Sequence, residues 1–311
     1  MRALVAAPGL PGAVALRELE EPEPGHNEAV VEVHASSLNR GECTALRSAS
    51  DGWRPGWDVA GVIDRPAIDG SSPEAGTRVV GWSNGGGWAD RVAVRSDHLA
   101  PIPDRVPFEV ASTLPVAGLT AVGALAFGGP LDGRRVAITG AAGGVGRFAV
   151  QLARAAGAQV TAVVGSPERG EGLAELGADH VVWPALEPDG DPIDLVLESV
   201  GGSSLAAALT RVSADGTVVS FGNSSNEHTS FDARVFYRRG RPTMRGYFVT
   251  HELLDGRLGT EQLAELVELV VTGRLLTDVD LRVPWTEAAT AIQSLVERRV
   301  RGKAVLLIGS A

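Results

Sequence analysis

The chain has 311 residues, a formal net charge of -10 and a single cysteine, Cys43. Its length allows two domains with separate cores, and 44% hydrophobic with 21% charged residues is ordinary for a soluble globular protein. The negative charge argues against nucleic acid as the main partner, because a phosphate backbone requires clustered cations. One cysteine excludes an intrachain disulfide and a multi-thiolate metal site, which favours a cytoplasmic location. We find no apolar run of membrane-spanning length and no signal segment, and therefore expect no membrane partner.

Strands dominate the predicted structure of the chain before Val110. The segment 29–35 alternates, with Ala29, Val31, Val33 and Ala35 on one face. Met1 begins another candidate strand. Glycine- and proline-rich turn clusters separate further short apolar runs, at 59–63, 78–81 and 89–94. The pattern indicates a β-rich first domain.

From about Val110 the pattern changes to alternating strands and helices. Strands are predicted at 136–140, 159–165, 193–199, 217–222 and 304–308. Helices are predicted after the first strand, along the apolar stripe from Val145 to Ala156, and at 168–176, 204–212, 261–272 and 286–298. This alternation implies a parallel sheet with right-handed crossovers.

The segment 136–146 reads V-A-I-T-G-A-A-G-G-V-G. A strand runs into a glycine-rich turn and a helix follows directly, which is the order that presents backbone N–H groups to a pyrophosphate. The G-x-G-x-x-G spacing falls on Ala141, Gly143 and Gly146, with alanine in the first slot. The alternative is an ordinary tight turn between a strand and a helix, but this context favours a dinucleotide site.

The end of the second strand of such a sheet distinguishes NAD from NADP, because a carboxylate there binds the ribose 2′-OH and repels a 2′-phosphate. Here the strand ends in Gly165 and Ser166, and Arg169 follows closely. Ser166 can donate a hydrogen bond and Arg169 can pair with a phosphate. Glu168 is expected to point away, in the first turn of the next helix. The sequence therefore favours NADPH; the alternative makes Ser166 a helix cap and Arg169 a surface charge.

Six segments in order resemble the medium-chain dehydrogenase/reductases, specifically the zinc-free quinone oxidoreductase branch related to ζ-crystallin. They are Ser37–Glu42, Leu114–Ala121, Ala141–Gly146, Leu176–His180, Glu198–Gly202 and Arg301–Leu306. The resemblance implies an α/β chain in which a GroES-like β-rich catalytic domain, from residues 1–112 and 251–311, receives an inserted Rossmann domain at 113–250 with a doubly wound parallel sheet. It also implies an active site in the cleft joining the domains, and a homodimer.

The turn, the end of the second strand and the resemblance together give two sets of candidate residues. The cofactor-binding set is Asn39, Thr120, Ala142, Gly143, Gly144, Val145, Gly165, Ser166, Arg169, Ser199, Val200, Gly222 and Lys303. The catalytic set, chosen as donors to charge developing on the acceptor, is Asn39, Arg40 and Tyr247, with Thr44 behind them. Each has an alternative: a turn for Asn39, an ion pair with Glu42 for Arg40, and a core or interface aromatic for Tyr247.

Departures from the family pattern affect metal and substrate. Zinc-dependent members have Gly-His-Glu where this chain has Gly56-Trp57-Asp58, and their structural lobe needs four cysteines, so we expect no metal. Cys43 is expected to be a small buried residue. Thr44 stands where many quinone reductases have tyrosine, and Trp183-Pro184 where many have Asn-Tyr. Four tryptophans before Val110 could stack on a flat acceptor, although core packing is the commoner role.

The sequence thus predicts an NADPH-dependent, metal-independent reductase of a quinone or other conjugated carbonyl, with the proton supplied by water. Two alternatives stay open. One is an enoyl reductase of a biosynthetic pathway, and the other is a nucleotide-binding protein with little turnover.

Overall fold

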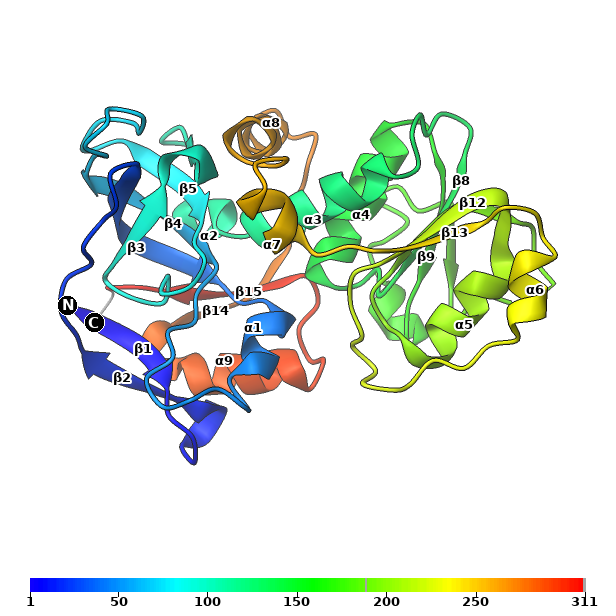
Figure 1. The fold of residues 1–311 in the computed structure, drawn as a ribbon, viewed down its shortest axis with the longest axis horizontal. Helices are drawn as coiled ribbons and strands as arrows, with labels where there is room; N and C mark the ends of the chain where they lie inside the picture. Colours follow the sequence, from blue (N-terminus) through cyan, green and yellow to red (C-terminus); the bar gives the residue numbers. More distant parts are fainter. Residues whose placement is uncertain (188, 310–311) are drawn as a thin grey trace. The chain divides into compact units, whose positions relative to one another are not determined.

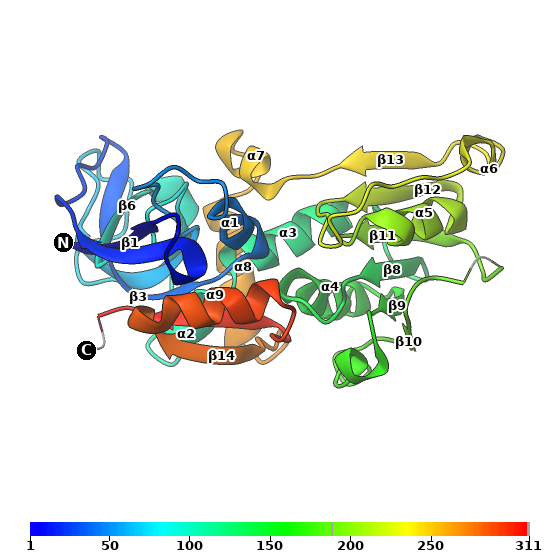
Figure 2. The same ribbon diagram turned by 90° about the horizontal axis from the view of Figure 1, so that it is seen from below.

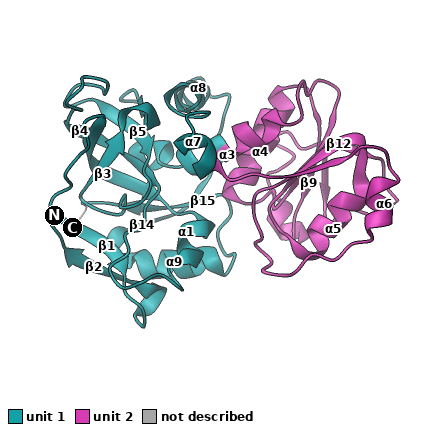
Figure 3. Ribbon diagram, in the orientation of Figure 1, with its two compact units in different colours: residues 1–119, 250–311 teal, residues 120–249 magenta. Residues whose placement is uncertain are grey.

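The computed structural model describes residues 1–187 and 189–309, which form two compact units. Unit 1 combines Met1–Leu119 with the chain from Thr250 onward, and unit 2 is Thr120–Val249 (Figure 3). The first boundary between the two units, between Leu119 and Thr120, falls inside helix α3 (Pro115–Ala126). The domain boundaries expected from sequence, after residues 112 and 250, stay predictions.

Unit 1 contains a seven-stranded mixed sheet. Its strands run in the order β14-β15-β3-β4-β5-β7, and β6 also pairs with β3. They are β3 (Glu28–Ser37), β4 (Asp58–Arg65), β5 (Arg78–Trp82), β6 (Arg91–Arg95), β7 (Leu99–Pro101), β14 (Val279–Pro284) and β15 (Lys303–Leu307). Because β15 pairs with β3, the last part of the chain completes the sheet that the first part begins. A two-stranded antiparallel sheet, β1 (Arg2–Ala6) with β2 (Val14–Glu18), belongs to the same unit.

The alternation predicted for β3 holds from Val31 to Ala35, where Glu32 and His34 are exposed between buried residues, but Val30 is buried as well as Ala29 and Val31. The side chains of Ala29, Val31 and Val33 belong to the main core of unit 1, together with Cys43. Cys43 is therefore a buried core residue, as expected. The helices of this unit are α1 (Arg40–Ala45), α2 (Phe108–Ala111), α7 (Val249–Leu254), α8 (Thr260–Val271) and α9 (Ala288–Val296), α7 beginning at the last residue of unit 2.

Unit 2 is built on six parallel strands in the order β10-β9-β8-β11-β12-β13, which Figure 2 shows stacked one above another. They are β8 (Arg135–Thr139), β9 (Gln159–Val163), β10 (His180–Val182), β11 (Ile193–Glu198), β12 (Val212–Ser220) and β13 (Thr243–Gly246). Helix α4 (Gly144–Ala155) connects β8 to β9, and α5 (Gly202–Arg211) connects β11 to β12 (Figure 1); α6 (Ala233–Tyr237) precedes β13. The chain order reverses between β8 and β11, so the carboxyl ends of these strands form the crevice where doubly wound sheets bind ligands.

The helix predicted at 168–176 is wrong. The structure has only a short 3-10 helix, Pro167–Gly170, and turns follow it to residue 177. Gly172 has a φ of +76°, a left-handed conformation that interrupts an α-helix. The apolar pattern of this segment therefore reflects packing of a compact loop, in which Leu173 is fully buried.

The expectation that the chain has no apolar run of membrane-spanning length is wrong for one segment. Phe108–Ala126, the α2–α3 run, is long and apolar enough to cross a membrane by composition, with a mean hydropathy of 1.4. The segment is not recognisable as one continuous apolar run, because glycine, alanine and threonine residues separate its larger apolar side chains. Since 72% of it is buried inside the structure, it behaves as a core helix of the described chain.

Candidate functional site

The glycine-rich turn lies at the carboxyl end of β8, beside the crevice of unit 2. Gly140 has a φ of +60°, and the Gly143 N–H donates to the Gly140 carbonyl at 2.9 Å before α4 begins. A Cβ on Gly146 would lie 2.5 Å from the Cα of Ala141 and 2.6 Å from the Gly140 oxygen. Position 146 therefore requires glycine, because the first turn of α4 packs directly on the backbone of the turn.

The turn fits the phosphates of a dinucleotide. The N–H groups of Gly144, Val145 and Gly146 occupy the first turn of a twelve-residue helix, where no intrahelical acceptor exists. A Cβ on Gly143 would meet only the Gly140 oxygen, at 3.3 Å, so the backbone surface is open there. Ala142, by contrast, is buried.

A buried carboxylate that the sequence analysis missed organises the neighbouring strand end. Glu198, the last residue of β11, accepts hydrogen bonds from the N–H groups of Val200 and Gly201 at 3.0 and 3.1 Å. Thr139, at the end of β8, donates to Glu198 at 3.2 Å and accepts from the Ser199 N–H at 2.9 Å. These bonds join both strands at the crevice and place Ser199 and Val200, two predicted cofactor contacts, at its edge.

The end of β9 is the region expected to select between nucleotides. A Cβ on Gly165 would meet nothing within 4 Å, so this surface is open. Ser166 and Arg169 are both partly exposed. Glu168 is exposed and lies in the first turn of the 3-10 helix Pro167–Gly170, and the neighbouring Ser166 hydroxyl is the main cause that lowers the pKa of Glu168. The expectation that its carboxylate points away from the nucleotide stays a prediction.

Unit 2 also has a cavity of about 210 Å³ at the opposite edge of its sheet. Its lining includes Arg135, Gln159, His180 and Ile193, which begin β8, β9, β10 and β11. Because these are the amino ends of the strands, this cavity is not where a doubly wound sheet receives the phosphates of a nucleotide.

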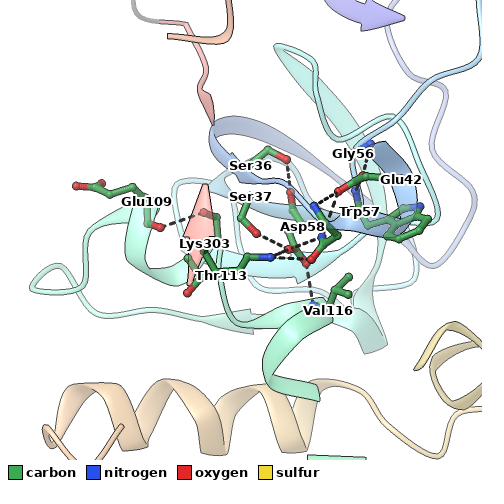
Figure 4. A network of polar contacts seen from close by, with 12 residues as sticks. Ser36, Ser37, Glu42, Gly56, Trp57, Asp58, Glu109, Thr113, Val116 and Lys303 are labelled. Carbon is green, nitrogen blue, oxygen red and sulfur yellow. Dashed lines mark hydrogen bonds and ion pairs between the residues drawn. The ribbon is translucent and has the colours of Figure 1, made fainter. Parts of the chain in front are cut away.

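In unit 1, a fully buried carboxylate, Asp58, lies at the centre of a polar network (Figure 4). Its Oδ1 accepts the Val116 N–H of α3 at 2.8 Å. Its Oδ2 accepts the Asn39 side-chain amide at 2.8 Å, the Ser37 hydroxyl, and the Lys303 ammonium at 3.3 Å. The carboxylate thus ties together the end of β3, the start of α3 and the start of β15.

Glu42 is the second buried carboxylate of this network. Its Oε1 accepts the Asn39 backbone N–H at 2.9 Å, and its Oε2 accepts the N–H groups of Gly56 and Trp57 at 3.0 and 3.1 Å. Burial, and next the Asp58 charge, raise the pKa of Glu42 to about 8, although the Asn39 and Gly56 N–H groups and the Lys303 charge oppose the shift. Glu42 therefore joins α1 to the segment that enters β4.

Two predicted site residues, Asn39 and Lys303, meet in this network. The Lys303 ammonium donates to the Asn39 Oδ1 at 2.7 Å, and Lys303 is only 4% exposed. The Asn39 amide nitrogen donates to both carboxylates. Each polar atom of the Asn39 side chain is therefore fixed by a charged neighbour, so its amide has one orientation.

The titration of Glu42 predicts a pH dependence of stability. Between about pH 5 and 8, the folded chain holds a proton on Glu42 that the unfolded chain has lost, so the free energy of unfolding should fall as pH rises through this window. Glu42→Gln removes the titrating group and should flatten the profile. Urea denaturation at several pH values measures it. The exposed Glu261→Gln variant should keep the wild-type slope, and an unchanged slope in Glu42→Gln would contradict the assignment.

The other catalytic candidates make structural contacts. Arg40 donates to the carbonyls of Leu295 and Val296 at 2.8 and 3.2 Å, at the end of α9, where a cation is favoured. Its alternative role as an ion-pair partner of Glu42 stays a prediction. Tyr247 is buried, and its ring packs edge-on against Phe127, with centroids 5.7 Å apart. A Cβ on Gly123 would overlap the Tyr247 hydroxyl, so this phenol lies directly on α3.

Of the remaining predicted residues, Thr120 is buried in α3, whereas Gly222 and Thr44 are exposed. The sequence analysis missed Asp58, Glu42 and Glu198 as buried acids. One signal existed for Glu42, because an Asn followed three residues later by Glu is a capping pattern. Within residues 1–187 and 189–309, no group of three or more His, Cys, Asp or Glu side chains is arranged to hold a metal ion.

Comparison with known proteins places the chain in a family. A family model described as zinc-binding dehydrogenase matches residues 144–272. A quinone oxidoreductase of Pseudomonas aeruginosa is 30% identical, over 97% of this chain and 98% of that protein. This chain belongs to the medium-chain dehydrogenase/reductases. Within them it is a zinc-free quinone oxidoreductase-type protein, and the predicted oxidoreductase class is confirmed.

Solved structures of other medium-chain dehydrogenase/reductases confirm the predicted fold class, GroES-like plus Rossmann. A mycobacterial protein solved in complex with NADPH superposes with a TM-score of 0.90 at 25% identity, covering 99% of this chain and 100% of that one. The CurK enoyl reductase has the same fold, with a TM-score of 0.84 at 23% identity and 99% coverage of both chains.

Proposed function

We propose that this medium-chain dehydrogenase/reductase is an NADPH-dependent, metal-independent reductase of quinones or other conjugated carbonyls. The observation that carries the proposal is the glycine turn at the carboxyl end of β8, where Gly146 packs on backbone and the partly exposed Gly144 and Val145 begin a twelve-residue helix. The quinone oxidoreductase relative and the NADPH-bound structural neighbour support the same choice.

Bound NADPH would supply the hydride, and the protein would supply binding and orientation. We propose that the N–H groups of Gly144 and Val145 bind the pyrophosphate and that the amide of Asn39 contacts the nicotinamide side. Lys303 and Asp58 support this role, because their charges hold the Asn39 amide in one orientation before ligand arrives. Roles for Arg40 and Tyr247 in stabilising charge on the acceptor stay predictions.

Arg169 is proposed to select NADPH over NADH by pairing with the 2′-phosphate. Arg169→Ala should weaken NADPH binding by a charge-assisted bond of about 1.5–3 kcal/mol and leave NADH binding nearly unchanged. Fluorescence titration with both cofactors measures this. The matched control is Arg147→Ala, a partly exposed arginine on α4. An equal loss of affinity for both cofactors in Arg169→Ala would show that this side chain does not bind the 2′-phosphate.

The alternative within enzymes is an enoyl reductase, which the shared fold with the CurK enoyl reductase keeps open. A panel of quinones and enoyl thioesters, followed by NADPH absorbance at 340 nm, distinguishes the two. Turnover of the thioesters alone would favour the alternative. NADPH binding with steady absorbance across the panel would favour a nucleotide-binding protein with little turnover.

We also propose that the protein is a homodimer that pairs through β13. All four residues of this edge strand are exposed, and it pairs with β12 on one side. Met244 and Phe248 are exposed apolar side chains along the same segment, and such an edge is commonly covered by another chain. Sedimentation velocity of the wild-type protein tests this assembly.

A further inference from the structure

Trp57 differs from the other tryptophans of unit 1 in its surroundings. Trp82, Trp88 and Trp285 are fully buried, and Trp53, although partly exposed, packs against the main core. Trp57 is partly exposed and lies outside that core. In Figure 4 its indole extends away from Asp58 and Lys303. We propose, building on the function proposed above, that the Trp57 indole is the surface on which a flat aromatic acceptor stacks.

The backbone of Trp57 is held from both sides. Its N–H donates to Glu42 at 3.1 Å, and its carbonyl accepts the Ser83 N–H at 2.8 Å. The next residue, Asp58, is fully buried in the network described above. The point from which the indole projects is therefore fixed, which reduces the entropy lost when a ligand stacks on the ring.

Gly41 holds the ring itself in place. A Cβ at this position would lie 3.0 and 3.1 Å from the Cη2 and Cζ3 atoms of the indole, so the outer edge of the ring rests on the Gly41 backbone. Such a distance is tighter than ordinary van der Waals contact, and Gly41→Ala would push the ring away. The glycine thus fixes one edge of the indole and leaves part of the ring accessible.

The same carboxylate links this ring to the proposed nicotinamide contact. Glu42 accepts N–H groups from both Asn39 and Trp57, and Gly41 lies two residues after Asn39 in the chain. Glu42 therefore holds the backbones of Asn39 and Trp57 together. An acceptor that reacts beside Asn39 would find the indole within the same part of unit 1. This arrangement favours acceptors with a fused aromatic ring over open-chain enones, because only a flat π-surface gains from stacking.

Steady-state kinetics with NADPH test the proposal using two acceptors, 9,10-phenanthrenequinone and the open-chain 3-penten-2-one. Trp57→Leu should raise KM for the quinone roughly tenfold. The variant's kcat should stay within about twofold of the wild-type value, because stacking contributes to binding rather than to the chemical step. Its KM values for NADPH and for the enone should also stay within about twofold, because neither binding event uses the indole. Trp57→Phe should recover most of the quinone affinity, and Gly41→Ala, which displaces the ring by a few tenths of an ångström, should raise KM for the quinone less than Trp57→Leu does. The core variant Trp53→Phe is the control and should show no preference between acceptors.

Equilibrium binding separates this proposal from the function on which it rests. If the wild-type protein oxidises no NADPH with either acceptor, the proposed function fails. Calorimetric titration of phenanthrenequinone into wild type and Trp57→Leu then still decides the role of the indole, and a roughly tenfold weaker Kd in the variant supports it. Equal affinity of the two proteins for the quinone, or an equal rise of KM for both acceptors, would overturn it.

Discussion

Lys303→Met should lower the free energy of unfolding by about 3–5 kcal/mol, because it removes one partner of a buried ion pair. The Lys303 ammonium lies 3.3 Å from the Asp58 Oδ2 and 2.7 Å from the Asn39 Oδ1, and both charged side chains are buried. Methionine has a similar length but leaves the Asp58 carboxylate without its cation. Urea denaturation followed by the fluorescence of the buried Trp82 and Trp88 measures the loss in this unit.

Two variants make this result specific to the buried pair. Arg17→Met breaks an exposed ion pair with Asp51, at 2.7 Å, and should leave the free energy of unfolding close to that of the wild type, because solvent screens the pair. The double variant Asp58→Asn with Lys303→Met should lose less stability than the sum of the two single variants, because neither charge is then left alone. A loss below about 1 kcal/mol for Lys303→Met would show that the network contributes little.

Gly146→Ala should weaken NADPH binding at least about tenfold and destabilise unit 2 by about 1–3 kcal/mol. The added Cβ would meet the Ala141 Cα at 2.5 Å and the carbonyl oxygens of Gly140 and Ala141 at 2.6 and 2.7 Å. These are backbone atoms, so the whole turn has to move and its N–H groups lose their alignment. Fluorescence titration with NADPH, on protein shown to be folded by circular dichroism, measures the affinity.

Gly246→Ala is the matched control, because a Cβ there meets nothing within 4 Å. It should bind NADPH as wild type does. Wild-type affinity in Gly146→Ala would mean that the dinucleotide does not depend on this turn.

Much of unit 2 was predictable from local patterns. The strand before the turn, the apolar stripe of α4 and the strands β11 and β12 follow from hydrophobic periodicity, which needs no knowledge of distant residues. The helix predicted at 168–176 is wrong for a local reason. The apolar residues of this segment suggested a helix, but Pro167 and Gly170 bound a short 3-10 helix and Gly172 adopts a left-handed conformation. The same 3-10 turn places Ser166 near Glu168, where its hydroxyl lowers the pKa of that carboxylate.

The network of unit 1 was not predictable in the same way. Asn39 and Lys303 are 264 positions apart in the chain, and only the pairing of β15 with β3 brings them together. The sequence indicated that both residues matter through the family resemblance. It did not indicate that they contact each other, or that Asp58 and Glu42 lie buried between segments that no local pattern connects.

The most direct test of the account is a titration of the wild-type protein with NADPH and NADH, followed by NADPH absorbance at 340 nm with a quinone. The account predicts saturable binding with NADPH tighter than NADH, and loss of absorbance that depends on the quinone and persists in the presence of a metal chelator. Folded protein that binds neither nucleotide, or turnover that the chelator abolishes, would contradict it.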